Sequence, residues 1–182
     1  MCVQGPTTTI QENIFNTGKL QISITDDFQR LQGFGKATSL TFTIEEISFG
    51  KEGSSLIKVL DIPKTIDIIQ FSNSSPAMLV EANVGEGVYT QIRLKLSNPS
   101  IKIYNQDLAI FNKTFPLIMS TNEILVGKIF SVEKGNTTHL VIDFDVTLSV
   151  SKIAGYSIEY RFNPVIDTFV ENEECDRCVK IT

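Results

Sequence analysis

Few residues of this chain have the types and spacing that catalysis requires. Its 182 residues include one histidine, His139, and no tryptophan. One imidazole leaves no histidine pair for a zinc site and at most one base for a nucleophilic triad. His139 follows two threonines at an outward position of an expected strand, and the chain contains no Gly-x-Ser-x-Gly nucleophile elbow. We therefore predict a non-enzymatic protein without catalytic residues, and we interpret His139 as an exposed side chain.

The three cysteines lie near the two ends of the chain, as Cys2, Cys175 and Cys178. Cys2 precedes a polar stretch, as does the lipid-carrying first residue of a mature bacterial lipoprotein; an ordinary cysteine near a natural start is the alternative. Cys175 and Cys178 form a Cys-x-x-Cys in an acidic tail. A zinc ribbon needs a second cysteine pair, and a thioredoxin-like motif needs a βαβ setting. We predict a lipid anchor at Cys2 and a Cys175–Cys178 disulfide in an oxidising compartment.

Two acidic residues form the candidate metal site. Asp143 and Asp145 are two positions apart on an expected strand, so both carboxylates project to one face. With Asp26 and Asp27 near them, they would offer oxygen ligands to Ca²⁺, which takes about six to eight. Solvated acids on a strand are the commoner case. We therefore expect no cofactor and keep Ca²⁺ as the alternative.

A second candidate binding patch consists of Tyr89, Arg93 and Lys95, which alternate along one expected strand and so share a face. An aromatic side chain beside two cations could bind a glycan. Tryptophan, the best ring for stacking on sugars, is absent from the chain. A solvated sheet face with cation–π contacts is therefore the alternative.

Three Asn-x-Ser/Thr sequons begin at Asn73, Asn112 and Asn136. The sequence at Asn98 is not a sequon, because its middle residue is Pro99. All three lie in expected turns. Such positions suit glycosylation in a secretory setting.

The charge balance excludes one class of partner. Sixteen basic residues against 21 acidic ones give a net charge of −5. A nucleic-acid groove needs clustered lysine and arginine, so we expect no nucleic-acid partner. No apolar run approaches the roughly 18 residues of a membrane helix, and no signal-peptide hydrophobic region is present. Membrane contact is therefore expected only through a lipid anchor.

Alternation of apolar and polar residues dominates the chain and predicts half-buried strands. Polar turns separate further, weaker strands. Only residues 77–83 are expected to form a short helix, and residues 27–33 a helical turn. The clearest alternating segments are 18–26, 88–96, 137–145 and 156–162, and the weaker strands are 56–60, 65–71, 101–104, 108–111, 124–132, 146–149 and 165–170.

Evenly spaced short strands predict an all-β fold, namely an antiparallel β-sandwich that is immunoglobulin-like or transthyretin-like in outline. We expect the sandwich to span residues 18–170. Residues 1–17 would precede it as a tether or donor-strand segment, and residues 171–182 would follow it as a tail with the cysteine pair. Residues 6–16 are β-prone, so they could be a tether, a first edge strand, or a strand donated to a neighbour's sheet.

In segment 38–49 the alternation of apolar and polar residues changes phase near the middle. One extra residue at Glu45–Glu46 would return the later apolar residues to the inward face, so we predict a β-bulge there. Such a bulge would present two exposed glutamates. The residues in phase are Leu40, Phe42 and Ile44 before the slip and Ile47 and Phe49 after it.

Four motifs occur in the order and spacing of a known family. They are GKLQISITD at residues 18–26, GVYTQIRL at 87–94, LVIDFD at 140–145 and NPVI at 163–166. Together they resemble the domain-of-unknown-function family 4382 over about residues 18–170. The family's opening strand usually continues with alanine and proline, where this chain has Asp27-Phe28. The resemblance implies an extracytoplasmic β-sandwich found in secreted and lipid-anchored surface proteins, without an established activity or catalytic residues.

These features predict a non-enzymatic, extracytoplasmic protein of the cell surface, either structural or adhesive. It would be a lipid-anchored lipoprotein or a subunit of a surface filament assembled by donor-strand exchange. The alternative is a ligand-binding module of the cell surface for a glycan or Ca²⁺. Expected partners are other surface proteins, copies of the chain itself, or glycans, and the expected location is the cell surface or the secreted fraction.

Overall fold

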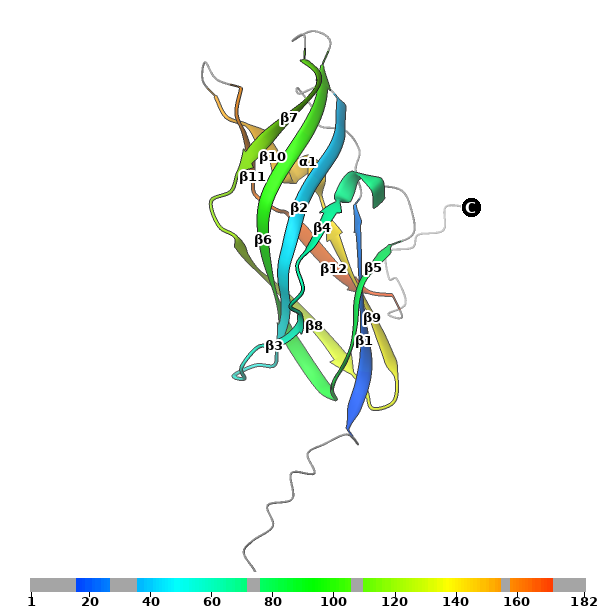
Figure 1. The fold of residues 1–182 in the computed structure, drawn as a ribbon. Coiled ribbons are helices and arrows are strands. Elements are labelled where there is room, and N and C mark those ends of the chain that lie inside the picture. The colour runs from blue at the N-terminus through cyan, green and yellow to red at the C-terminus, as the bar shows by residue number, and fades with distance from the viewer. Residues whose placement is uncertain (1–15, 27–35, 72–75, 106–109, 155–157, 172–182) are drawn as a thin grey trace, which may run out of the picture.

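A computed structural model of the chain shows two β-sheets packed face to face (Figure 1). It describes residues 16–26, 36–71, 76–105, 110–154 and 158–171. The predicted all-β sandwich is confirmed. Most strand pairs are antiparallel, and two are parallel, β1 with β9 and β11 with β7. Within the described residues, no helix is both long and apolar enough to cross a membrane.

The smaller sheet has four strands in the order β12-β9-β1-β5. β1 lies inside this sheet, antiparallel to β5 and parallel to β9. Its alternation places Leu20, Ile22 and Ile24 on the inner face, each at most 1% exposed. The strands are β1 (Thr17–Asp26), β5 (Ala77–Gly85), β9 (Thr137–Phe144) and β12 (Ile166–Val170).

The larger sheet has eight strands, built around two long ones, β2 and β6, which pair along most of their length. On its other side β6 pairs first with β8 and then with β7. In the same way β2 pairs with β4 and then with β3. The strands are β2 (Lys36–Gly50), β3 (Ile57–Leu60), β4 (Lys64–Asp67), β6 (Gly87–Asn105), β7 (Ile110–Ile118), β8 (Glu123–Val132), β10 (Val150–Lys152) and β11 (Tyr160–Phe162).

Aromatic rings join the two sheets in the core. The ring of Phe42 on β2 lies 5.0 Å, centroid to centroid, from that of Phe144 on β9 of the opposite sheet. Phe162 on β11 is 5.7 Å from the same Phe42 ring. These contacts bury apolar surface from both sheets in one continuous cluster, which is the main favourable term in folding.

The predicted bulge at Glu45–Glu46 is confirmed, because the register between β2 and β6 shifts between Ile44 and Glu46. The shift returns Ile47 and Phe49 to the core, each at most 1% exposed. The expectation that both glutamates are exposed is wrong, because Glu46 is 8% exposed and Glu45 is half-buried.

Two predicted elements have the opposite secondary structure. Residues 77–83, expected as a short helix, belong to strand β5. Alanine, methionine, leucine and glutamate favour helices there, but pairing with β1 overrides that preference. Residues 146–149, expected as a strand, form the helix α1 (Val146–Ser149), because the Asp145 side chain accepts a hydrogen bond from the backbone N–H of Leu148.

Two other predicted strands have different limits. Residues 68–71 form a short 3₁₀ helix, η1 (Ile68–Phe71), instead of continuing β4. Strand β6 runs unbroken through Asn98 and Pro99, where two strands were expected. Asn98 has φ of 50°, a left-handed conformation that asparagine tolerates better than most residues. The helical turn expected at residues 27–33 lies outside the described residues.

Candidate functional site

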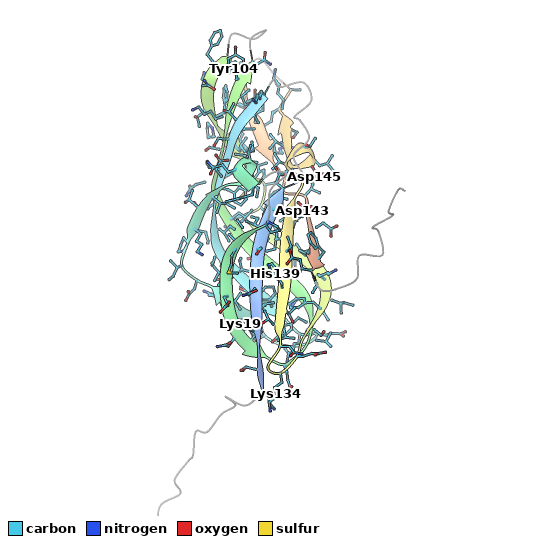
Figure 2. The ribbon with its side chains drawn as sticks, turned by 90° about the vertical axis from the view of Figure 1, so that its right-hand side faces the viewer. Lys19, Tyr104, Lys134, His139, Asp143 and Asp145 are labelled. Atoms are coloured by element: carbon cyan, nitrogen blue, oxygen red, sulfur yellow. The ribbon has the colours of Figure 1, made fainter. Side chains whose placement is uncertain are left out.

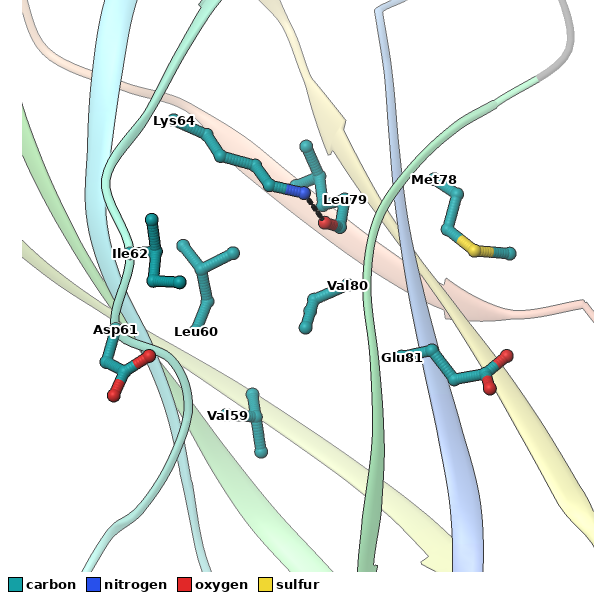
Figure 3. Close-up of a pocket in the computed structure, with 9 residues that line it drawn as sticks. All are labelled: Val59, Leu60, Asp61, Ile62, Lys64, Met78, Leu79, Val80 and Glu81. Carbon is teal, nitrogen blue, oxygen red and sulfur yellow. Dashed lines mark hydrogen bonds between the residues drawn. The ribbon is translucent and has the colours of Figure 1, made fainter.

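An open, largely apolar groove lies between the edges of the two sheets. β5 ends the strand order of the small sheet and β3 ends that of the large one. Between them lies a space of about 480 Å³, here called the edge groove (Figure 3). Val59, Leu60 and Ile62 line one side and Leu79 and Val80 the other, with Lys64 across one end.

The break between β3 and β4 creates one wall of this groove. Both strands pair with β2, Leu60 opposite Ile47 and Lys64 opposite Ile44. Pro63 lies in the break and has no backbone N–H to donate to a neighbouring strand. Ile62, just before it, is 74% exposed, whereas Leu60 is buried at 4%. On this side of the groove the buried Leu60 therefore forms an apolar floor, and the exposed Ile62 forms an apolar rim.

A bulge shapes the other wall. The register between β1 and β5 shifts between Ile22 and Ser23, which leaves Leu79 as the extra residue on β5. The Nζ of Lys64 donates a hydrogen bond to the carbonyl oxygen of Leu79 across the groove (Figure 3). Lysines and bulges at a sheet edge both hinder nonspecific pairing of that edge with a strand of another chain. Lys64 therefore closes one end of the groove.

Glu81 belongs to the rim and not to the interior of the edge groove. Its carboxylate accepts a hydrogen bond from Gln21 at 2.7 Å and pairs with the Nζ of Lys19 at 2.8 Å, both on β1. These two contacts lower the pKa of Glu81, the Gln21 hydrogen bond most. The only cation among the side chains that line the groove is thus Lys64.

His139 is not the exposed residue that was predicted. The Oγ of Ser23 lies 2.7 Å from its Nε2, and its Nδ1 pairs with the carboxylate of Glu171. Its position on β9, facing out of the small sheet, is visible in Figure 2. The contacts join β1, β9 and the end of β12 on that face.

Ser23, His139 and Glu171 are connected in the same order as the serine, histidine and acid of a nucleophilic triad. Their surroundings, however, differ from those of a catalytic triad. Ser23 is 1% exposed, so a substrate cannot approach its Oγ. It also lies on a strand that is paired on both sides, whereas acyl transfer needs free donors aimed at the developing oxyanion. The arrangement therefore supports a structural link between strands.

Replacing Ser23 with alanine should remove this link and lower the free energy of unfolding by about 1 kcal/mol, the usual worth of one hydrogen bond. Urea unfolding at neutral pH would measure the loss. Ser151, exposed on β10, provides the matched control, because its alanine variant should unfold with the wild type. Equal stability of the two variants would contradict the structural role of the Ser23–His139 contact.

The candidate ligand patch does not form, because Tyr89 faces the core. Tyr89 is 1% exposed, and its ring stacks on Phe130 at 5.3 Å and 14°. The register between β6 and β8 shifts between Tyr89 and Gln91, where β8 has one more residue than β6, and Tyr89 and Ile92, three positions apart, both face the core. Burial raises the pKa of the Tyr89 hydroxyl, which donates to the carbonyl oxygen of Gly85 at 2.7 Å.

Arg93 and Lys95 do share the outer face of the large sheet, but they contact Glu46. The Nη2 of Arg93 is 2.5 Å from Oε1 of Glu46, and the Nζ of Lys95 is 4.0 Å from its Oε2. Lys58 on β3 pairs with the same Oε2 at 2.9 Å, and Ser48 donates to Oε1 at 2.6 Å. These positive charges and hydrogen bonds, with Lys58 the largest contributor, lower the pKa of Glu46 to about 2.

The predicted calcium pair is also separated by the structure. β9 ends at Phe144, so Asp145 lies outside the strand and serves as the N-cap of α1. Asp143 stays on β9 and is partly buried (Figure 2). Asp27 lies outside the described residues. Within the described part of the chain, no three histidine, cysteine, aspartate or glutamate residues gather as metal ligands.

The remaining predicted sites fall partly outside the described residues. Cys2, Cys175, Cys178 and Asn73 lie outside them. Asn136 is exposed in the turn before β9, where its side chain donates to Glu133 at 2.8 Å. Asn112 is exposed as well, but it lies inside strand β7 and not in the expected turn, with φ of 50°.

Fold and surface together define an all-β sandwich of two mixed sheets with an open groove along one side. The chain matches the sequence model of DUF4382, a domain of unknown function, over residues 17–164. It belongs to that family, as the resemblance of its four motifs indicated. No curated protein and no solved structure matches the chain.

Proposed function

We propose that this protein is a non-enzymatic component of the cell surface, held outside the cytoplasm by a lipid on Cys2, with a structural or adhesive role. The observation that carries the proposal is the position of two ends of the sandwich. The chain enters β1 at one end, beside the turn that holds Lys134. The β6–β7 hairpin, with Tyr104, lies at the other (Figures 1 and 2).

Hydrogen bonds from Gly135 and Lys134 hold residues 16 and 17, at the start of β1, at this end of the sandwich. The N–H of Gly135 donates to the carbonyl oxygen of Thr17 at 3.0 Å, and Lys134 donates to the side chain of Asn16 at 3.3 Å. A lipid on Cys2 would therefore hold this end toward the membrane. The opposite end would then point outward, as a displayed module requires.

The far end carries exposed aromatic side chains. Phe111 is 64% exposed and Tyr104 is 38% exposed, and their rings pack edge to face with centroids 6.0 Å apart. Exposed aromatic residues are enriched where proteins contact partners. This pair supports contact with another surface protein at the end remote from the anchor.

A second candidate is a subunit of a surface filament, and the edge groove favours it. An open apolar space between two sheet edges is the kind of surface that accepts a strand from another chain. The glycan-binding alternative loses its support because Tyr89 is buried. The calcium alternative loses support because Asp145 caps a helix.

The lipid anchor predicts a specific modification. Protein isolated from its native membranes should carry a thioether-linked diacylglyceryl group on Cys2, measured by intact mass and peptide mapping. Cys2→Ser should abolish the mass increase and move the protein from the detergent phase to the aqueous phase. Cys175→Ser is the matched control and should keep the lipid. An unmodified Cys2 in native protein would overturn the anchor.

A further inference from the structure

We propose that the edge groove binds residues 10–14 of a second copy of this chain as an added β-strand. The proposal deepens the filament candidate and rests on it, because it names the surface and the segment that join two copies. Neither the family match nor the strand topology names a partner for this groove.

The groove offers unpaired sheet edges on both sides. β5 has a strand partner on one side only, β1, and β3 pairs on one side only, with β2, among the described residues. Edges of this kind attract an extended chain, because main-chain hydrogen bonds supply affinity and pockets for alternate side chains supply specificity. β3 and β5 are too close for a strand to fit between them, so an added strand would pair with the main chain of β5 at the outer edge of the small sheet and contact the apolar side chains of β3.

Apolar side chains form the floor of the groove, Lys64 lies across one end, and the carboxylates of Asp61 and Glu81 complete its lining. Leu60 and Leu79 are both 4% exposed at its floor, and Val59 and Val80 are partly buried above them. The ammonium of Lys64 reaches across the space to the carbonyl oxygen of Leu79. A matching strand would therefore present apolar side chains to the floor and a negative charge at the end that Lys64 occupies.

Residues 10–14, Ile-Gln-Glu-Asn-Ile, have this pattern. Side chains of an extended strand alternate, so Ile10, Glu12 and Ile14 share one face while Gln11 and Asn13 share the other. With Glu12 beside Lys64, one of the two isoleucines would contact the apolar floor of the groove and the other would lie beyond Lys64. On binding, Lys64 exchanges the Leu79 carbonyl for the Glu12 carboxylate, and the freed carbonyl accepts a backbone N–H of the added strand.

Chain length keeps Ile14 out of the groove of its own copy, which favours a second copy as the occupant. The N–H of Glu86 donates to the carbonyl oxygen of Asn16 at 2.9 Å, so the chain is still beside the end of β5 at residue 16. Glu81 is the groove residue of β5 nearest that end, four residues from Gly85, or about 13 Å along the strand. Two residues span at most about 7 Å. Ile14 therefore cannot enter the groove of its own copy.

The first test uses the full-length, unlipidated chain with a photo-crosslinking benzoyl-phenylalanine in place of Ile10. Copies labelled with ¹⁴N and ¹⁵N are mixed and irradiated, and the crosslinked peptides are identified by mass. We expect light–heavy products that join position 10 to residues 59–64 or 78–81. Products confined to a single copy, or products that reach another surface, would overturn the proposal.

The second test measures the pairing of Glu12 with Lys64. Glu12→Lys and Lys64→Glu should each raise the concentration at half-assembly by roughly tenfold or more, since close charge pairs at interfaces couple strongly. The double variant should restore assembly, and Asn13→Lys, on the opposite face of the strand, should leave it unchanged. Analytical ultracentrifugation measures all four.

Lys64→Glu could lose assembly because it fails to fold, so a second variant tests the same contact from the other side. The double variant Ile10→Asp with Ile14→Asp changes no residue of the described strands and should also abolish assembly. A wild-type chain that stays monomeric at the highest concentration, or charge variants that assemble like the wild type, would overturn the proposal. Because the protein is unlipidated, this outcome is separate from the result at Cys2.

Discussion

Replacing Phe42 with alanine should lower the free energy of unfolding by about 3–5 kcal/mol, the usual cost of removing a buried aromatic ring. Phe42 is fully buried, and its ring contacts Phe144 of the opposite sheet and Phe162 of its own. Its loss would leave a cavity between the sheets. Since domains are stable by only about 5–15 kcal/mol, this single change should remove much of the total.

Urea unfolding followed by circular dichroism would measure this loss. Phe111 is the matched control, because the same truncation at a ring that is 64% exposed should cost less than about 1 kcal/mol. Phe42→Leu should fall between the two, since it keeps part of the apolar volume. A Phe42→Ala variant no less stable than Phe111→Ala would contradict the packing of the two sheets through Phe42.

Replacing Glu46 with glutamine should cost about 1–3 kcal/mol near neutral pH, the range for a hydrogen bond to a charged group. Glu46 lies among three basic side chains, Arg93, Lys58 and Lys95, on the outer face of the large sheet. Arg93 and Lys58 contact its two carboxylate oxygens. Glutamine keeps the shape but removes the negative charge. The three basic residues around it would then repel one another without compensation.

The difference between Glu46→Gln and the wild type should depend on pH. The folded-state pKa of Glu46 is about 2, below its ordinary value of 4.5. A lowered pKa stabilises the fold above the unfolded-state value, and this stabilisation fades as pH falls from about 4.5 to 2. The stability gap should therefore be full at pH 7 and shrink across that window.

Unfolding free energies at several pH values between 2 and 7 would measure this dependence. Glu159, exposed between β10 and β11, serves as the control, and its glutamine variant should follow the wild type at every pH. A gap that stays constant down to pH 2 would show that the ionised Glu46 carboxylate contributes no stability.

The strands that alternate without interruption could be predicted from the sequence because their pattern is local. Leu20, Ile22 and Ile24 on β1 needed only the period of a strand to be assigned to the core. The bulge at Glu45–Glu46 was predictable for the same reason, since apolar residues on both sides of it revealed the change of phase. The parallel pairing of β1 with β9 joins segments more than a hundred residues apart and left no local sign.

The candidate site was less predictable. On β6 the alternation changes phase between Tyr89 and Ile92, among residues that are polar or moderately apolar, so the change left no sign in the sequence and Tyr89 was assigned to the wrong face. His139 was interpreted as having no partner because Ser23 and Glu171 are remote in sequence. The one available signal was a serine among the isoleucines of β1, which marks a polar contact on the outer face.

The sequence by itself determined that this chain is a β-sandwich of DUF4382, where most of its strands lie and where β2 bulges, but not that residues 77–83 form a strand. These properties follow from the side-chain period and from motifs a few residues long. Only the tertiary structure decided that β3 and β5 lie edge to edge around a groove, that Lys64 crosses it, and that Glu46 gathers three cations. Strand order determines these neighbours, and strand order depends on how distant strands pack, which the alternation within one strand does not encode.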